Sequence, residues 1–156
     1  MTKKFEYTAH SFEIEITNSA IKRVGLEKFK GVLKSAFKIY IIKYRKEFIY
    51  IGHTKTYLSS RFSLGFKATL TVGNNGYHGY KWIKSHRGKK LDLIVFTFPN
   101  MIDKIDREIV ETIEAELVFQ VRTKYGRWPE CQNEIHFFNK EKSLIKFSEK
   151  LFKEIC

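Results

Sequence analysis

FKIYIIKYRKEFIYIG, residues 37–52, is the stretch of the sequence that decides the fold. It holds two runs rich in β-branched and aromatic residues, Phe37–Tyr44 and Glu47–Gly52, which are separated only by Arg45 and Lys46. Two such runs joined by two residues are typical of an antiparallel β-hairpin. The stretch therefore predicts a hairpin, from which the rest of the chain can be placed.

A short helix and a buried strand are predicted after the hairpin. Thr54 precedes a helical pattern in which Leu58 and Phe62 lie four residues apart, and Gly65 offers a stop. Leu91–Phe98 is almost continuously apolar, which favours a central strand buried on both faces of a sheet.

The second half of the chain predicts two more helices. A long helix is expected from about Met101 to Tyr125, with Asn100 as its cap and Gly126 as its end. A short strand at Ile135–Phe138 and an amphipathic helix at Lys140–Ile155 are expected to follow.

The N-terminal part predicts a strand at Phe12–Thr17, where apolar and acidic residues alternate, followed by a helix capped by Asn18 or Ser19 and running to about Lys34. The expected fold class is therefore α/β (α+β), with a small, mainly antiparallel sheet flanked by helices. A chain of 156 residues is expected to form one domain, with its core at about residues 37–138.

The charge balance indicates a polyanionic partner. The 29 Lys and Arg residues against 17 Asp and Glu give a net charge of +12 and a pI near 9.7. A basic block without any acid occupies residues 81–90, and its cations are Lys81, Lys84, Arg87, Lys89 and Lys90. This block is a candidate for contacts with a phosphate backbone, although a solvated helix face and a generally lysine-rich surface are the alternatives.

The cysteine count and the short apolar runs indicate where in the cell the protein is expected. Cys131 and Cys156 are too few for a disulfide framework. No signal peptide and no apolar run long enough for a bilayer is evident, so a cytoplasmic protein without a membrane partner is expected.

Glu114 is the most informative single residue. On the long predicted helix it falls within the apolar stripe that Val110, Leu117 and Val118 help to form. An ionised carboxylate on an apolar face is costly unless a cation or strong donors meet it. A functional site would provide these, but so would a structural salt bridge to an Arg, or a helix rolled so that Glu114 reaches solvent.

The hairpin resembles the two half-motifs that name the GIY-YIG nuclease superfamily. Lys38-Ile39-Tyr40 stands for the first half-motif, with Lys38 in place of Gly, and Tyr50-Ile51-Gly52 for the second. His53 and Thr54 then lead into the predicted helix with Leu58 and Arg61, and Glu114 precedes an apolar pair. The resemblance covers about residues 37–138.

The resemblance implies a metal-dependent DNA endonuclease. Glu114 would hold one Mg²⁺ or Mn²⁺ ion, Arg61 would bind the phosphate, and Tyr40 would act as general base or as a relay to one. Tyr50 would position the attacking water, His53 would serve as an auxiliary base or phosphate contact, and Asn133 stands roughly where the family often has an asparagine. Each of these residues also has a purely structural interpretation.

The implied substrate is double-stranded DNA, and a compact restriction endonuclease acting as a homodimer on a short symmetric site fits a chain of this size. A phage or mobile-element nuclease is also consistent with the chain. Two alternatives stay open: a DNA- or RNA-binding module that kept the fold without catalysis, and a structure-specific repair nuclease. Fold-level analogy alone does not choose among them.

Overall fold

A computed structural model describes residues 5–25, 29, 32, 35–70, 81–132 and 141–156. The described strands are β1 (Thr8–Ile16), β2 (Ile21–Arg23), β3 (Phe37–Tyr44), β4 (Glu47–Thr54) and β5 (Lys90–Phe98). They form one sheet in the order β2-β1-β5-β3-β4, in which all neighbours are antiparallel. The described helices are α1 (Leu58–Leu70), α2 (Lys81–Ser85), α3 (Lys104–Tyr125) and α4 (Lys142–Ile155). The expected α+β class with an antiparallel sheet is therefore confirmed.

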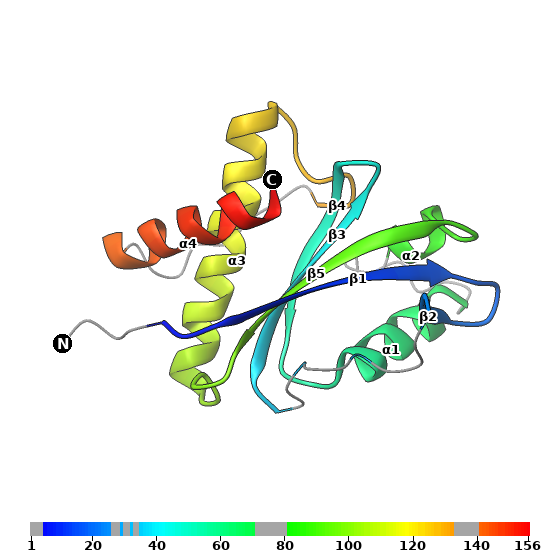
Figure 1. The fold of residues 1–156 in the computed structure, drawn as a ribbon, viewed down its shortest axis with the longest axis horizontal. Coiled ribbons are helices and arrows are strands. Elements are labelled where there is room, and N and C mark those ends of the chain that lie inside the picture. Colours follow the sequence, from blue (N-terminus) through cyan, green and yellow to red (C-terminus); the bar gives the residue numbers. More distant parts are fainter. Residues whose placement is uncertain (1–4, 26–28, 30–31, 33–34, 71–80, 133–140) are drawn as a thin grey trace.

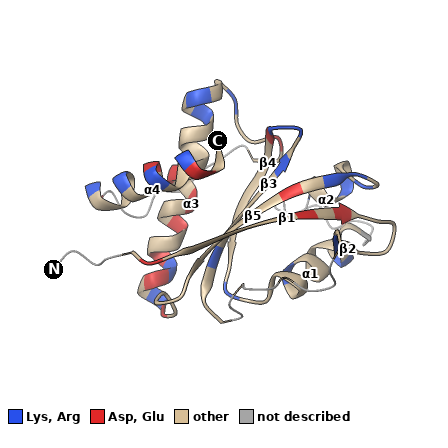
Figure 2. Cartoon of the chain, viewed as in Figure 1, with Lys and Arg blue, Asp and Glu red and all other residues tan. Residues whose placement is uncertain are grey.

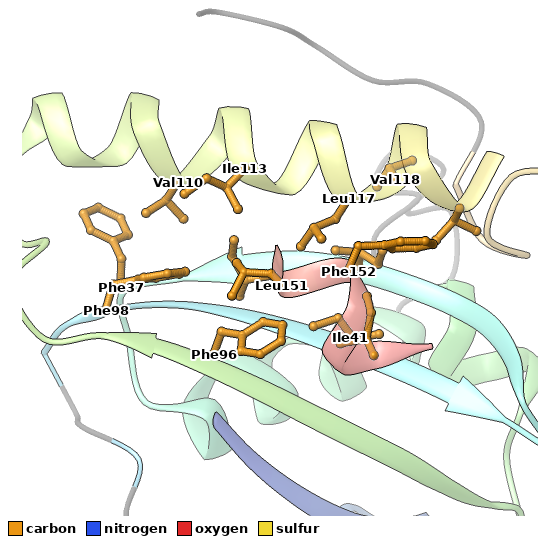
Figure 3. Close-up of a cluster of buried hydrophobic side chains, with 14 of the residues drawn as sticks. Phe37, Ile41, Phe96, Phe98, Val110, Ile113, Leu117, Val118, Leu151 and Phe152 are labelled. Carbon is orange, nitrogen blue, oxygen red and sulfur yellow. The ribbon is translucent and has the colours of Figure 1, made fainter. Parts of the chain in front are cut away.

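The helices cover both faces of the sheet (Figure 1). α3 and α4 lie on one face, where Val110, Ile113 and Leu117 of α3 pack against buried side chains of β3 and β5 (Figure 3). α1 and α2 lie on the other face, where a second buried cluster contains Phe62 of α1 and Trp82 of α2. In β3 and β5, alternate residues enter alternate clusters, as the pleat requires.

The predicted hairpin is present as β3 and β4, and it contains a β-bulge that the sequence analysis missed. Ile42 pairs with Tyr50 while Lys43 pairs with Phe48, so Ile49 is the extra residue. Paired residues share a face of the sheet. The bulge therefore turns Tyr50 towards α1, the face that Tyr40 also occupies.

The predicted central strand is confirmed. β5 lies between β1 and β3 in the sheet, and Leu91, Leu93, Val95 and Phe96 are all buried. The C-terminal helix is likewise present as α4, although the predicted strand at Ile135–Phe138 lies outside the described residues.

The predicted helix from Asn18 or Ser19 to about Lys34 is wrong in its described part. Ile21–Arg23 is instead strand β2, which pairs with β1. The Thr17 hydroxyl accepts the N–H of Ala20 at 3.0 Å and holds a tight turn, so Asn18 and Ser19 are turn residues. A hydroxyl that bonds its own following backbone competes with helix formation.

Two helix boundaries also differ from the prediction. The cap of α3 is Asp103, whose side chain accepts the N–H of Asp106, and Asn100 instead donates to Glu6. Gly65 does not end α1, which continues to Leu70. Gly126, in the left-handed conformation, does end α3 as expected.

None of the helices in the described part of the chain combines the length and the apolar character needed to cross a bilayer.

Candidate functional site

A cavity of about 550 Å³ opens at the outer edge of β4, where this strand runs into α1. Its walls come from three segments that are distant in the sequence: the end of β4, the face of α1, and the first half of α3 with the loop before it. The lining residues are Phe37, Tyr50, His53, Thr54, Lys55, Thr56, Arg61, Leu64, Ile102, Asp103, Lys104, Arg107 and Glu114. Four of the five residues predicted as catalytic therefore line one cavity.

The upper part of the β4 edge is covered by the chain itself. Glu130 and Cys131 donate backbone N–H groups to the carbonyls of Phe48 and Ile49. The Gln132 amide then bonds both the N–H and the carbonyl of Ile51, at 2.9 and 2.7 Å. Because an uncovered strand edge is a site for unwanted pairing, this cover protects β4 as far as Ile51, and the cavity occupies the next stretch.

The two tyrosines of the half-motifs pack together over Gly52. Their ring centroids are 5.9 Å apart. Tyr50 lines the cavity, whereas Tyr40 is only 1% exposed and lies behind it. A Cβ added to Gly52 would come within 2.6 Å of Tyr40 Cζ and of Tyr50 Cε1. Gly52 is therefore required for the close approach of both rings.

Glu114 meets a histidine rather than an arginine. Its Oε2 bonds Nδ1 of His53 from β4, and its side chain is 22% exposed. The other ring nitrogen of His53 lies 3.5 Å from Glu111, whose carboxylate accepts from Arg107 at 2.8 Å. Arg107 therefore pairs with Glu111, one helical turn before Glu114, and the partner of Glu114 is His53.

The surroundings of His53 raise its pKa above that of an ordinary histidine. Burial lowers its pKa, but the hydrogen bond and charge of Glu114, together with the charge of Glu111, outweigh burial and raise the pKa above its usual value. The hydrogen bond with His53 thus fixes the direction of the Glu114 carboxylate.

Around Arg61 the cavity gathers three more cations, which the sequence analysis did not single out. Arg61 lies on α1, Lys55 at the end of β4, and Lys104 and Arg107 at the start of α3. Cations in the first turn of a helix are disfavoured by the helix dipole. Lys104, the first residue of α3, is therefore placed against the helix dipole, and no pattern in the sequence pointed to it or to Lys55 and Arg107.

Lys38, the departure from the first half-motif, is fully buried. Its Nζ donates to the carbonyl of Ala36 at 2.7 Å and to that of Lys55, on the cavity wall, at 3.4 Å. Burial lowers the pKa of the ammonium to about 8. The Lys38 side chain therefore links the start of β3 to the backbone that follows β4.

The basic block lies apart from the cavity. Lys81 and Lys84 are exposed on α2, Arg87 is exposed in the following turn, and Lys90 begins β5. Lys89 is half-buried, with its Nζ 5.0 Å from the ring of Tyr44. None of the five lines the cavity. Asn133, predicted to contact nucleic acid, lies outside the described residues.

The Glu114 carboxylate fits a Mg²⁺ ion that the substrate completes. This ion binds through one or two carboxylates, with phosphate oxygens and several waters as its other ligands. Within the described ranges, no group of three or more His, Cys, Asp or Glu side chains forms a site that would hold a metal by itself.

Comparison with protein-family models, curated proteins and solved structures gives no match for the chain. The residues of the cavity therefore carry the functional assignment.

Proposed function

We propose that this protein is a metal-dependent DNA endonuclease of the GIY-YIG type, with its active site in the cavity beside β4. The observation that supports this most is convergence. Tyr50, His53, Arg61 and Glu114 come from a strand and two helices on opposite faces of the sheet, yet they line one cavity. A structural role for each residue separately does not require that they meet.

In this proposal the four cavity cations bind the phosphate. The Arg61 guanidinium donates to the non-bridging oxygens, for which its planar fork is better suited than an ammonium. Lys55, Lys104 and Arg107 add positive charge around the same space. Charge that accumulates on the phosphate during attack is stabilised by donors already in place.

Glu114 holds the Mg²⁺ or Mn²⁺ ion, which when bound stabilises charge on the phosphate and on the leaving oxygen. His53 fixes the Glu114 carboxylate through its Nδ1. The Tyr50 hydroxyl, on the cavity wall, orients the attacking water. Tyr40, buried behind Tyr50, is the relay: its hydroxyl accepts the proton that the attacking water loses and passes its own proton on, so the phenol stays neutral.

The basic residues of α2 and the following turn hold more of the DNA backbone, outside the cavity. Figure 2 shows cations gathered at α2, in the turn before β5 and at the tip of the β3–β4 hairpin. Lys81, Lys84 and Arg87 are exposed there. Such contacts position a duplex without reading its sequence. Cutting at a defined sequence, as a restriction-type homodimer would, is the finer form of the proposal.

The test is cleavage of supercoiled plasmid and linear phage DNA with Mg²⁺, with Mn²⁺ or with EDTA. Wild type is expected to cut with metal only, and Glu114→Ala to lose activity by at least about a hundredfold, as loss of a main electrostatic group does. Glu108→Ala is the matched control, because Glu108 is an exposed carboxylate of the same helix away from the cavity lining.

Discrete fragments would support a restriction-type enzyme, whereas nicking or smearing would keep the nuclease and remove sequence specificity. Cutting confined to flaps or branched DNA would favour a repair nuclease. Salt-sensitive DNA binding without cleavage under either metal would replace the proposal by a non-catalytic binding module.

A further inference from the structure

Two large aliphatic side chains from different elements are exposed in the lining of the cavity. Leu64 on α1 is 58% exposed, and Ile102 in the loop before α3 is 56% exposed, and both belong to the cavity lining. The position of Ile102 is fixed, because its carbonyl accepts from Lys55 Nζ at 2.5 Å. Single exposed aliphatic residues are common on protein surfaces, but two that line one charged cavity offer contacts to an apolar ligand group.

The charge around the cavity favours a negatively charged ligand. The same cavity is lined by Lys55, Arg61, Lys104 and Arg107 but by only two acids, Asp103 and Glu114. A second copy of this chain would bring a net charge of +12 to these cations, whereas a polyanion would complement them. A ligand that joins a negative phosphate to a flat apolar group, as a nucleotide does, fits both sets of side chains.

The spacing places the apolar contact beside the phosphate. Leu64 follows Arg61 by three residues on α1, so the two share a helix face with Cβ atoms roughly 5–6 Å apart. Tyr57 lies one turn before Arg61, and its backbone carbonyl accepts the Arg61 N–H. The ring of Tyr57 is exposed and begins the same stripe of the helix surface. If Arg61 binds the scissile phosphate, Leu64 reaches the neighbouring nucleotide.

In a regular duplex the flat face of that base is hidden by its stacked neighbours. Aliphatic wedges such as Leu and Ile contact bases when they enter a step and partly unstack it. The energy needed is smallest where the step is already mismatched or unpaired.

We propose that Leu64 and Ile102 form an apolar clamp for an unstacked base next to the phosphate that is cut. This inference rests on the proposed nuclease function and specifies its substrate: DNA in which stacking is broken, or is broken on binding, at the scissile step. The clamp makes locally distorted duplexes the preferred ligands.

The experiment measures binding in the non-cleaving Glu114→Ala protein with two 30-base-pair probes, a length of about three helical turns. One probe is fully matched, the other has a central mismatch, and both carry 2-aminopurine beside the centre. We expect the mismatched probe to bind tighter by on the order of tenfold, with an increase of 2-aminopurine fluorescence as its base leaves the stack.

Leu64→Ser and Ile102→Ser, each added to this protein, are expected to remove the preference and the fluorescence increase. Ile105→Ser is the matched control, because Ile105 is 69% exposed three residues after Ile102 but is not part of the cavity lining. Thermal unfolding followed by circular dichroism verifies that all variants are folded.

Equal affinity for the two probes, or an equal loss for both in the Leu64 and Ile102 variants, would overturn the clamp. So would a change in sedimentation of these variants without a change in preference, since the face would then belong to a second copy of the chain. Wild-type cleavage is measured separately. Cleavage without mismatch preference overturns the clamp alone, and absence of both cleavage and binding overturns the nuclease as well.

Discussion

Gly52 explains why a glycine closes the second half-motif. In other motifs a glycine often supplies a left-handed backbone, but here the requirement is space, because both tyrosine rings lie where its Cβ would be. The positions of the two rings therefore depend on Gly52, which contributes to the candidate site although it has no functional group of its own.

Gly52→Ala is expected to displace both rings. Overpacking of a tight core site typically lowers the free energy of unfolding by ~1–3 kcal/mol, and shifted tyrosines should slow DNA cleavage by about tenfold or more, since small misplacements near reacting groups are costly. Cleavage rate and urea denaturation measure both effects.

Gly126→Ala is the control: its φ of 73° makes alanine unfavourable by ~1 kcal/mol, but nothing lies within 4 Å of the added Cβ. An equal loss of activity in both variants would reduce the Gly52 effect to general destabilisation.

Lys38 gives a prediction for pH. Its pKa is about 8 in the folded protein because burial disfavours the ammonium, against an ordinary value of 10.5. Between these values the unfolded chain binds a proton that the folded chain does not, so the contribution of Lys38 to stability rises with pH. The free energy of unfolding of Lys38→Met, relative to wild type, is therefore expected to be highest below pH 8 and to fall towards pH 10.

Urea denaturation of both proteins at pH 7, 8, 9 and 10 measures this difference. Lys84→Met, changed at an exposed position of α2, controls for the loss of one positive charge. A difference between Lys38→Met and wild type that stays constant with pH would contradict a buried ammonium at Lys38.

At the scale of elements, the β3–β4 hairpin shows what its sequence could and could not predict. Strand composition and the two-residue connection were sufficient to place both strands. The same connection, in an uninterrupted ladder, would put Tyr40 and Tyr50 on opposite faces. Only the bulge at Ile49 brings the rings together, so a common role for the tyrosines required a bulge that pattern analysis of each strand separately did not reveal.

The hairpin turn is itself unfavourable and gives the next prediction. Arg45 and Lys46 have φ of 47° and 70°, a conformation that costs a non-glycine residue ~1–2 kcal/mol. The Arg45 guanidinium lies 5.1 Å from the Tyr44 ring, a contact worth only about 0.5–1 kcal/mol. Replacing the pair by Asn-Gly, the residues preferred in such turns, should therefore raise the free energy of unfolding by about 1–2 kcal/mol.

Urea denaturation of Arg45→Asn with Lys46→Gly measures this change, and an unchanged slope would show that only stability has altered. An unchanged or lower midpoint would contradict strain at the turn. If the same variant binds DNA more weakly while it is more stable, the two cations are kept for binding despite their backbone cost.

The elements that were predicted wrongly failed for local reasons. The sequence after Thr17 carries helix-cap residues and an apolar period, yet the Thr17 hydroxyl forms a turn, and pairing with β1 makes Ile21–Arg23 a strand. The cap of α3 moved from Asn100 to Asp103, because only Asp103 forms a reciprocal capping box with Asp106. Side-chain bonds of this kind depend on backbone geometry that periodicity does not contain.

At the scale of the whole molecule, part of the site was predictable and part was not. Glu114 stood out because a carboxylate in an apolar stripe needs a partner, and the structure supplies His53. Lys55, Lys104 and Arg107 are ordinary surface cations in the sequence. They meet Arg61 only because β4 sits at the edge of the sheet, between helices on its two faces, which is a property of the tertiary fold.

The net charge of +12 makes a further whole-molecule prediction, because a general attraction to DNA and a specific basic surface respond differently to the position of a charge. Each phosphate contact contributes about −0.9 to the slope of log affinity against log salt. Lys81→Ala with Lys84→Ala on α2 should therefore reduce the magnitude of this slope by up to about 1.8, if both lysines contact backbone.

Lys146→Ala with Lys153→Ala, at exposed positions of α4 on the opposite face of the sheet, removes the same charge and should change the slope little. Fluorescence anisotropy of a labelled duplex between 50 and 200 mM salt, a range over which such contacts are strongly screened, distinguishes the two pairs. Equal slopes in both variants would mean that DNA is attracted by the charge of the whole molecule, and that the cations of α2 have no special place in binding.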